Sequence, residues 1–215
     1  LYLILKEKNR VISSLSKSYK DSFSKKNIKH FNKKFDYRII GMGGSTLGAQ
    51  AIYEFLKKKI KKNFIFVDNL NAFENKKAKK NLNNLIISKS GNTTETIVNA
   101  NILIKKKDKN LFITEKKKSY LSLLAQKLKA EVVDHNNYIG GRYSVLSEVG
   151  MLPAELMGLN YKNFRQLNNL VKNKYFMRAL VSNVEATIYF LKAKKFNSII
   201  INYDEQSTNL FNWYQ

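Results

Sequence analysis

The sequence predicts an α/β protein: a doubly wound parallel sheet of five strands with flanking helices. Short apolar runs alternate with helical segments between residues 37 and 134, which is the pattern of βαβ units joined by right-handed crossovers. A glycine-rich turn, GMGGSTLG, follows the first apolar run. The chain is 44% hydrophobic over 215 residues, enough for a packed core.

The strands are expected where short apolar runs are bounded by polar residues or glycine, at 37–42, 64–67, 85–88, 111–114 and 131–134. The intervening segments are expected to be helices, at 47–60, 72–82, 94–106 and 120–128. In a flavodoxin-like strand order, 2-1-3-4-5, the first and third strands are neighbours at the switch point where ligands bind.

Helical segments are also expected before and after the strands of this sheet in the sequence. Residues 1–30 carry a polar helix with an apolar stripe, formed by Ile4, Val11, Ile12 and Leu15. Beyond residue 134, a glycine-bearing loop enters a helix near Ser144, with Pro153 near the end of its first segment. Two further helices are expected at 161–173 and 178–195, and a buried-type strand at 198–203.

Four parts of the chain follow from this pattern. They are an N-terminal helical segment (1–35), a first α/β domain (36–155), connecting helices (156–196) and the truncated start of a second α/β domain (197–215). The last part is expected because one strand with the beginning of a helix cannot bury its own faces.

The formal charge of +23 invites a nucleic-acid or membrane function, which the distribution of charge disfavours. Arginine, which nucleic-acid sites prefer, occurs at only five positions. The lysines are scattered, and none lies between Lys34 and Lys57 or between Lys129 and Lys162. We expect no nucleic-acid partner and no membrane association. The absence of cysteine fits a reducing compartment, and a cytoplasmic location is expected.

The first segment with chemical potential is GMGGSTLG, residues 41–48. Its glycines permit a tight turn and close approach of a ligand, and the following helix offers unpaired N–H groups to an anion. A dinucleotide fingerprint would require glycine where Thr46 stands, although Asp68 lies where a ribose-binding acid would be. A purely structural turn, with close packing of strand and helix, is the alternative.

The second segment is SKSGNTTET, residues 88–96. Ser88, Ser90, Thr93 and Thr94 supply hydroxyl groups and Lys89 supplies one positive charge, a set that fits the acceptor oxygens of phosphate. The alternative is a helix cap at Thr93 or Thr94, which explains only part of the segment. Because this loop and the Ser45 loop follow neighbouring strands, they suit a monophosphate better than a dinucleotide.

The third segment is GGRYSVLS, residues 140–147. Arg142 lies in a lysine-free stretch, and a guanidinium beside bare backbone suits a phosphate or a developing oxyanion. A structural salt bridge or a contact with a helix C-terminus is the alternative. His135 is expected to be a solvated loop residue, and Glu148 an exposed or packing residue without a catalytic role.

Together these three segments resemble the phosphoglucose isomerase family, in the order GMGGSTLG, SKSGNTTET and GGRYSVLSEVGMLP. The first two are shared with other phosphosugar-binding (SIS) domains, and the third is the more specific. The final NLFNWYQ resembles the start of the family's segment before its catalytic glutamate. The resemblance implies interconversion of glucose 6-phosphate and fructose 6-phosphate through an enediol, without metal or organic cofactor, in a homodimer.

The resemblance also implies a role for individual residues. Arg142 would stabilise the enediolate, Gly44 and Gly141 would lie against the substrate, and five side chains would hold its phosphate: Ser45, Ser88, Lys89, Ser90 and Thr93. The family's general base, ring-opening histidine and late lysine have no counterpart here and are expected beyond Gln215, so we expect this chain by itself to be inactive. The alternative is a non-catalytic phosphosugar-binding SIS module.

Overall fold

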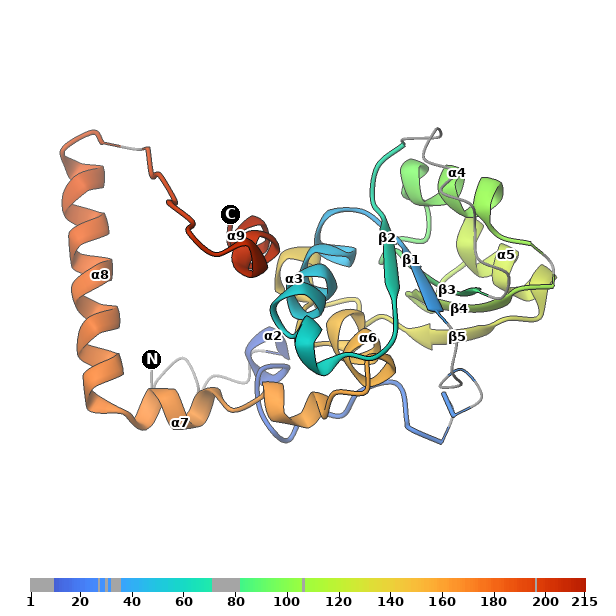
Figure 1. Cartoon of the computed structure of the whole chain (residues 1–215), viewed down its shortest axis with the longest axis horizontal. Coiled ribbons are helices and arrows are strands. Elements are labelled where there is room, and N and C mark those ends of the chain that lie inside the picture. Colours follow the sequence, from blue (N-terminus) through green and yellow to red (C-terminus); the bar gives the residue numbers. More distant parts are fainter. Residues whose placement is uncertain are drawn as a thin grey trace.

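The computed structural model describes residues 10–26, 28–29, 31, 36–70, 82–105, 107–195 and 197–215. Its centre is a five-stranded sheet in the order β2-β1-β3-β4-β5, with every neighbouring pair parallel (Figure 1). The predicted fold class and the predicted strand order are both confirmed. The strands are β1 (Asp36–Ile40), β2 (Phe64–Val67), β3 (Leu82–Ile87), β4 (Lys109–Thr114) and β5 (Glu131–Asp134).

β3 begins earlier than predicted because polar residues join the ladder. Asn83 and Asn84 pair with β1 on one side and with β4 on the other. The buried Asn84 Nδ2 donates to Asn110 Oδ1 at 2.8 Å, so the amide of the central strand has a partner on its neighbour. An apolar-run criterion misses such residues because their hydrogen bonds exist only after the strands pair.

Helices cover both faces of the sheet (Figure 1). On one face α3 (Leu47–Phe55) and α6 (Glu148–Leu156) pack against Ile39, Leu85 and Ile113. On the other, α4 (Thr94–Leu103) and α5 (Tyr120–Leu128) pack against a second group, Ile40, Ile86 and Phe112. The alternation of inward and outward side chains along each strand therefore serves two cores, as expected for a doubly wound sheet.

Two helices end earlier than predicted. α3 ends at Phe55 and is followed by a 3₁₀ turn, η2 (Lys57–Lys59), and α4 ends at Leu103 before the extended Ile104. In both cases the predicted continuation contains lysines, which offer no apolar stripe to the sheet. α5 has the predicted limits, and Ser119 caps it in a reciprocal exchange with Ser122.

The predicted N-terminal helix is largely absent from the described residues. Only α2 (Arg10–Ser13) is helical there, and residues 1–9 lie outside the described ranges. The following irregular segment buries Phe23, Ile28 and Phe31 in the core with α3 and α6. The helix predicted for 72–82 lies outside the described residues except for Leu82, which belongs to β3.

The loop after β5 enters its helix later than predicted. A 3₁₀ turn, η3 (Gly141–Tyr143), precedes α6, whose cap is Ser147 rather than Ser144. Pro153 lies inside α6, which continues to Leu156. Every residue of α6 is buried, and this packing maintains the helix across the missing N–H group.

The C-terminal third differs from the sheet domain. It contains η4 (Tyr161–Phe164), α7 (Leu167–Lys172), α8 (Lys174–Lys192), η5 (Glu205–Ser207) and α9 (Thr208–Tyr214). α8 projects away from the sheet domain, and α9 returns to pack against α3 (Figure 1). The strand predicted at 198–203 is not formed, because the described residues provide no partner for its backbone. No helix in the described ranges has the length and apolar character of a membrane span.

Candidate phosphate-binding site

Two of the three sequence motifs meet at the carboxyl edge of the sheet. The loop 41–48 follows β1 and the loop 88–96 follows β3, and these strands are paired with Ile40 opposite Ile86. The loops are in tight contact, since a Cβ on Gly41 would lie 3.0 Å from the carbonyl oxygen of Ile87. The two loops therefore lie side by side at the switch point of the sheet, as predicted.

The first loop is a compact turn at the start of α3. Gly43 has a φ of +54°, which favours glycine. Residues Gly43–Ser45 form a 3₁₀ turn, η1, and the Thr46 hydroxyl donates to the Gly43 carbonyl at 3.2 Å. Ser45 is half-buried. The turn leaves the N-terminus of α3, the positive end of its dipole, at the sheet edge.

The second loop is organised by its own hydroxyl groups. The Oγ atoms of Ser88 and Thr93 lie 2.9 Å apart, and Ser88 Oγ accepts from the Gly91 amide at 3.2 Å. Ser90 Oγ accepts from the Asn92 amide at 3.1 Å. Thr93 is the N-cap residue of α4 but makes no side-chain capping bond. The capping interpretation is therefore wrong for Thr93, whose hydroxyl pairs across the loop instead.

Gly91 has a structural reason to be glycine. Its φ is +68°, and a Cβ there would lie 2.2 Å from Ser119 Oγ. The Gly91 carbonyl accepts from the Leu121 amide at 3.0 Å, which ties the loop to the start of α5. The hydroxyl loop is therefore packed directly against the start of α5.

Lys89 is not a free cation in this structure. Its Nζ lies 3.9 Å from Glu115 Oε1, and the same carboxylate pairs with Lys117. The Glu115 amide also donates to the Lys89 carbonyl at 3.1 Å, so the two backbones are joined where β3 and β4 end. Sequence inspection missed Glu115 because only strand pairing brings it to Lys89.

The third motif contacts the first. A Cβ on Gly44 would lie 2.3 Å from the Gly141 carbonyl oxygen, so Gly44 is needed for the approach of the two backbones. Ser144 Oγ donates to the carbonyls of both Gly141 (2.7 Å) and Gly44 (3.2 Å). Arg142 is therefore carried next to the Ser45 turn.

The Arg142 side chain is exposed. Within the ranges that the structure describes, no hydrogen bond or ion pair occupies its guanidinium, so neither structural alternative, a salt bridge or a helix-end contact, is found. Its donors are thus available to an anion that enters between the loops.

Three other predicted positions are now placed. Asp68 accepts from Gln50 Nε2 at 2.8 Å, which gives the proposed ribose-binding acid a partner within the fold. His135 is 2% exposed, so its assignment as a solvated residue is wrong, and burial lowers its pKa. Glu148 is fully buried, which agrees with the packing alternative and not with the exposed one. Tyr19 and Ser22, far away in the sequence, hydrogen-bond to the Glu148 carboxylate.

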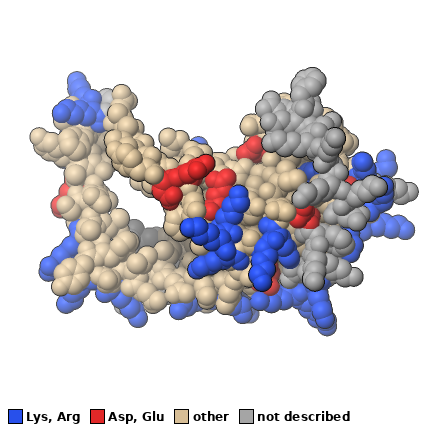
Figure 2. All heavy atoms as spheres, viewed as in Figure 1, with Lys and Arg blue, Asp and Glu red and all other residues tan. Residues whose placement is uncertain are grey.

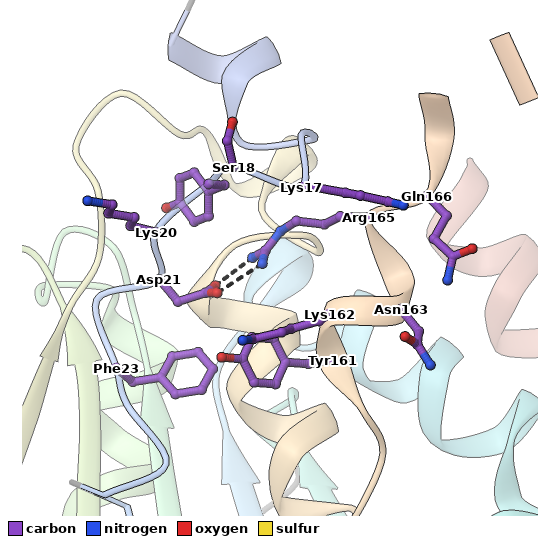
Figure 3. Close-up of a pocket in the computed structure, with 11 residues that line it drawn as sticks. Lys17, Ser18, Lys20, Asp21, Phe23, Tyr161, Lys162, Asn163, Arg165 and Gln166 are labelled. Carbon is purple, nitrogen blue, oxygen red and sulfur yellow. Dashed lines mark hydrogen bonds and ion pairs between the residues drawn. The ribbon is translucent and has the colours of Figure 1, made fainter. Parts of the chain in front are cut away.

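A separate pocket of about 610 Å³ lies between residues 17–23 and 161–166 (Figure 3). Asp21 and Arg165 form a bidentate ion pair within it, and their side chains are 5% and 3% exposed. None of the predicted phosphate-binding side chains lines this pocket. The site indicated by the loop chemistry and this pocket are therefore different places.

Charge on the surface shows no single basic face in the view of Figure 2. Lysine and arginine side chains occur in separate groups, with acidic side chains and broad uncharged areas between them. This agrees with the scattered lysines of the sequence. Sheet order, hydroxyl loops and helix N-termini together form an α/β domain of the class that typically binds anions at this edge.

Comparison with known proteins specifies the family. The family model described as "Phosphoglucose isomerase" matches residues 14–211. Glucose-6-phosphate isomerase from Methanocaldococcus jannaschii is 31% identical over 195 residues, and that from Acholeplasma laidlawii is 34% identical over 209. Each alignment covers 82% of this chain and 48% of the relative. The chain belongs to the phosphoglucose isomerase family, and it spans about half the length of these relatives.

A solved structure shows the same fold. A hypothetical protein from Thermus thermophilus superimposes with a TM-score of 0.74 and 18% identity, covering 99% of this chain and 56% of that one. The superposition includes nearly all of the chain, and thus α8 and α9 as well as the sheet domain. At this identity the likeness concerns the fold.

Proposed function

We propose that the chain carries the phosphate-binding part of a glucose-6-phosphate isomerase site. The observation that supports this most is the meeting of three loops at one sheet edge, through the Gly44–Gly141 contact and the pairing of β1 with β3. The predicted phosphate ligands are Ser45, Ser88, Lys89, Ser90 and Thr93. The backbone amides at the starts of α3 and α4 add donors to these side chains.

The proposed reaction depends on stabilising a negative charge that develops on the substrate. Isomerisation of glucose 6-phosphate to fructose 6-phosphate moves a proton between C1 and C2 and develops negative charge on an enediolate oxygen. Arg142, unpaired in the described part of the chain and next to Gly141, would stabilise that charge. The resemblance assigns none of the 215 residues as the base that moves the proton. We therefore propose that this chain binds substrate without turning it over.

Phosphate recognition would require a local exchange of partners. Ser88 and Thr93 are bonded to each other, and Lys89 lies against Glu115. A phosphate at the loop would take over these donors, since charge-assisted hydrogen bonds are stronger than hydroxyl–hydroxyl bonds. Release of Lys89 from Glu115 is therefore part of the proposed binding step.

Calorimetric titration tests this proposal. The chain should bind glucose 6-phosphate and fructose 6-phosphate but not glucose, and a coupled isomerase assay should show no turnover. Binding of glucose equal to that of glucose 6-phosphate would contradict the proposed phosphate site. Normal turnover would contradict the assignment of the base outside these residues.

The alternative is a phosphosugar-binding module without isomerase activity. It predicts the same phosphate loops but assigns no role to Arg142. If Arg142→Lys leaves the affinity for sugar phosphates and for their carboxylate analogues unchanged, this alternative is favoured.

The organisation of the remaining chain is also a proposal. Residues 36–155 would form the first phosphosugar domain, 156–196 the connection, and 197–215 part of a second α/β unit. The exposed, extended segment around Ile199 and Ile201 supports this, since such side chains suit a buried strand. The homodimer expected from the family is tested by size-exclusion chromatography with light scattering, which measures the molar mass in solution.

A further inference from the structure

A short segment near the N-terminus, Tyr19–Ser22, is linked to the two residues that flank Ser147, namely Leu146 and Glu148. Glu148, which follows Ser147, accepts from the Tyr19 hydroxyl at 3.0 Å and from the amide and hydroxyl of Ser22 at 2.8 and 2.9 Å. Asn136 Nδ2 donates to the same carboxylate at 3.2 Å. Glu148 is fully buried, and every one of these partners donates a hydrogen bond to its carboxylate.

Leu146, which precedes Ser147, is held indirectly by Asp21 of the same segment. Asp21 forms the bidentate pair with Arg165, whose Nε donates to the Leu146 carbonyl at 3.1 Å. Figure 3 shows the Asp21 and Arg165 side chains directed toward each other. Segment 19–22 therefore reaches Leu146 through one buried ion pair and Glu148 directly.

These contacts hold the C-terminal end of the Arg142 loop, which comprises residues 141–147. The loop is held at its start by the Gly44–Gly141 contact and by Ser144 Oγ. At its other end, Ser147 caps α6 between the two anchored residues. Arg142 itself has no partner in the described part of the chain, so the backbone around it determines only where its side chain begins.

We propose that Glu148 is a positioning residue for Arg142, acting through the start of α6 and segment 19–22. The inference rests on the proposed function, because it concerns the same site. It assigns to a glutamate in the first turn of α6 a role in ligand recognition, although Glu148 is buried away from the ligand. Removal of its charge should impair Arg142-dependent binding and leave phosphate binding intact.

The test compares two probes. Inorganic phosphate reports the hydroxyl loops, whereas 6-phosphogluconate adds a carboxylate at the opposite end that Arg142 can bind. In the Glu148→Gln variant, affinity for 6-phosphogluconate should fall about tenfold, as expected for loss of a hydrogen bond to a charged group. Affinity for phosphate should change by less than about twofold.

The matched control is Glu155→Gln, at the other end of α6. Glu155 is 7% exposed and pairs with Lys25, which follows segment 19–22 in the sequence, at the end of α6 opposite to Glu148. It should leave both affinities unchanged. Glu148→Gln should also add nothing to Arg142→Lys when the two are combined, because both act on one contact.

The outcomes separate the two levels of the proposal. Absence of phosphate binding in the unmodified chain overturns the proposed function. The positioning role is overturned if the unmodified chain binds phosphate and Glu148→Gln lowers the affinity for both probes equally. It is also overturned if Glu155→Gln lowers the affinity for 6-phosphogluconate as much as Glu148→Gln does. If Glu148→Gln fails to fold, Tyr19→Phe decides: it removes one hydroxyl from the carboxylate, and an unchanged ratio of the two affinities overturns the proposal.

Discussion

The sheet domain and α8 use similar apolar side chains but place them in different surroundings. Ile86 on β3 is fully buried among α4, α5 and β4, whereas Ile188 on α8 is 46% exposed. No residue of α8 is buried, although the helix is amphipathic. Secondary structure thus follows from the local pattern, whereas stability comes from what covers the apolar face.

Matched substitutions of isoleucine would measure this difference. Ile86→Ala should lower the free energy of unfolding by about 2–5 kcal/mol, because it removes buried contacts and leaves a cavity. Ile188→Ala should change it by less than about 0.5 kcal/mol, since its side chain already contacts solvent. Urea unfolding followed by circular dichroism provides both values. Equal effects at the two positions would mean that α8 is covered in solution.

A glycine pair would sharpen the comparison within the sheet domain. Gly44→Ala should destabilise the chain by about 1–3 kcal/mol and weaken ligand binding, because its methyl group would overlap the Gly141 carbonyl. Gly140→Ala is the control, since its Cβ would have its nearest neighbour at 3.7 Å and its φ is −72°. Thermal unfolding and titration with phosphate measure both effects. A tolerated alanine at Gly44 would contradict the contact between the loops.

The smallest expected effect concerns pH. Burial lowers the pKa of His135 below its usual 6.5, so the folded chain keeps this histidine neutral where the unfolded chain binds a proton. Its contribution to stability is therefore complete above pH 6.5 and declines as the pH falls toward the lowered pKa. His135→Gln should flatten the fall in stability between about pH 7 and 5. An unchanged slope would mean that other groups cause the acid sensitivity.

The sequence predicted the sheet better than the parts that depend on distant contacts. Continuous apolar runs identified each strand of the sheet, and the two glycine- and hydroxyl-rich loops indicated a common edge once the order was assumed. The predicted start of β3 is too late, because polar side chains such as Asn84 pair across the strands and an apolar run does not include them. The prediction of a strand at 198–203 is wrong because a strand requires a neighbouring strand to pair with, and the described residues supply none.

The candidate site shows the same division. Residue types at Ser45, Ser88 and Arg142 follow from motif chemistry that is visible in the sequence. The burial of Glu148 does not, because Tyr19 and Ser22 contact it from far away in the chain. The partner of Lys89, Glu115, was missed for the same reason. Local chemistry thus indicates a site, and tertiary contacts determine which groups are free to act.

The most direct test follows backbone amide resonances of the chain during addition of glucose 6-phosphate, with glucose as control. The account predicts that glucose 6-phosphate shifts the amides of residues 43–48, 88–96 and 140–144, and that glucose shifts none of them. Ser90→Ala combined with Thr93→Val should abolish these shifts. Shifts confined to the pocket around Arg165, or spread over the scattered lysines, would contradict a phosphate site at the sheet edge.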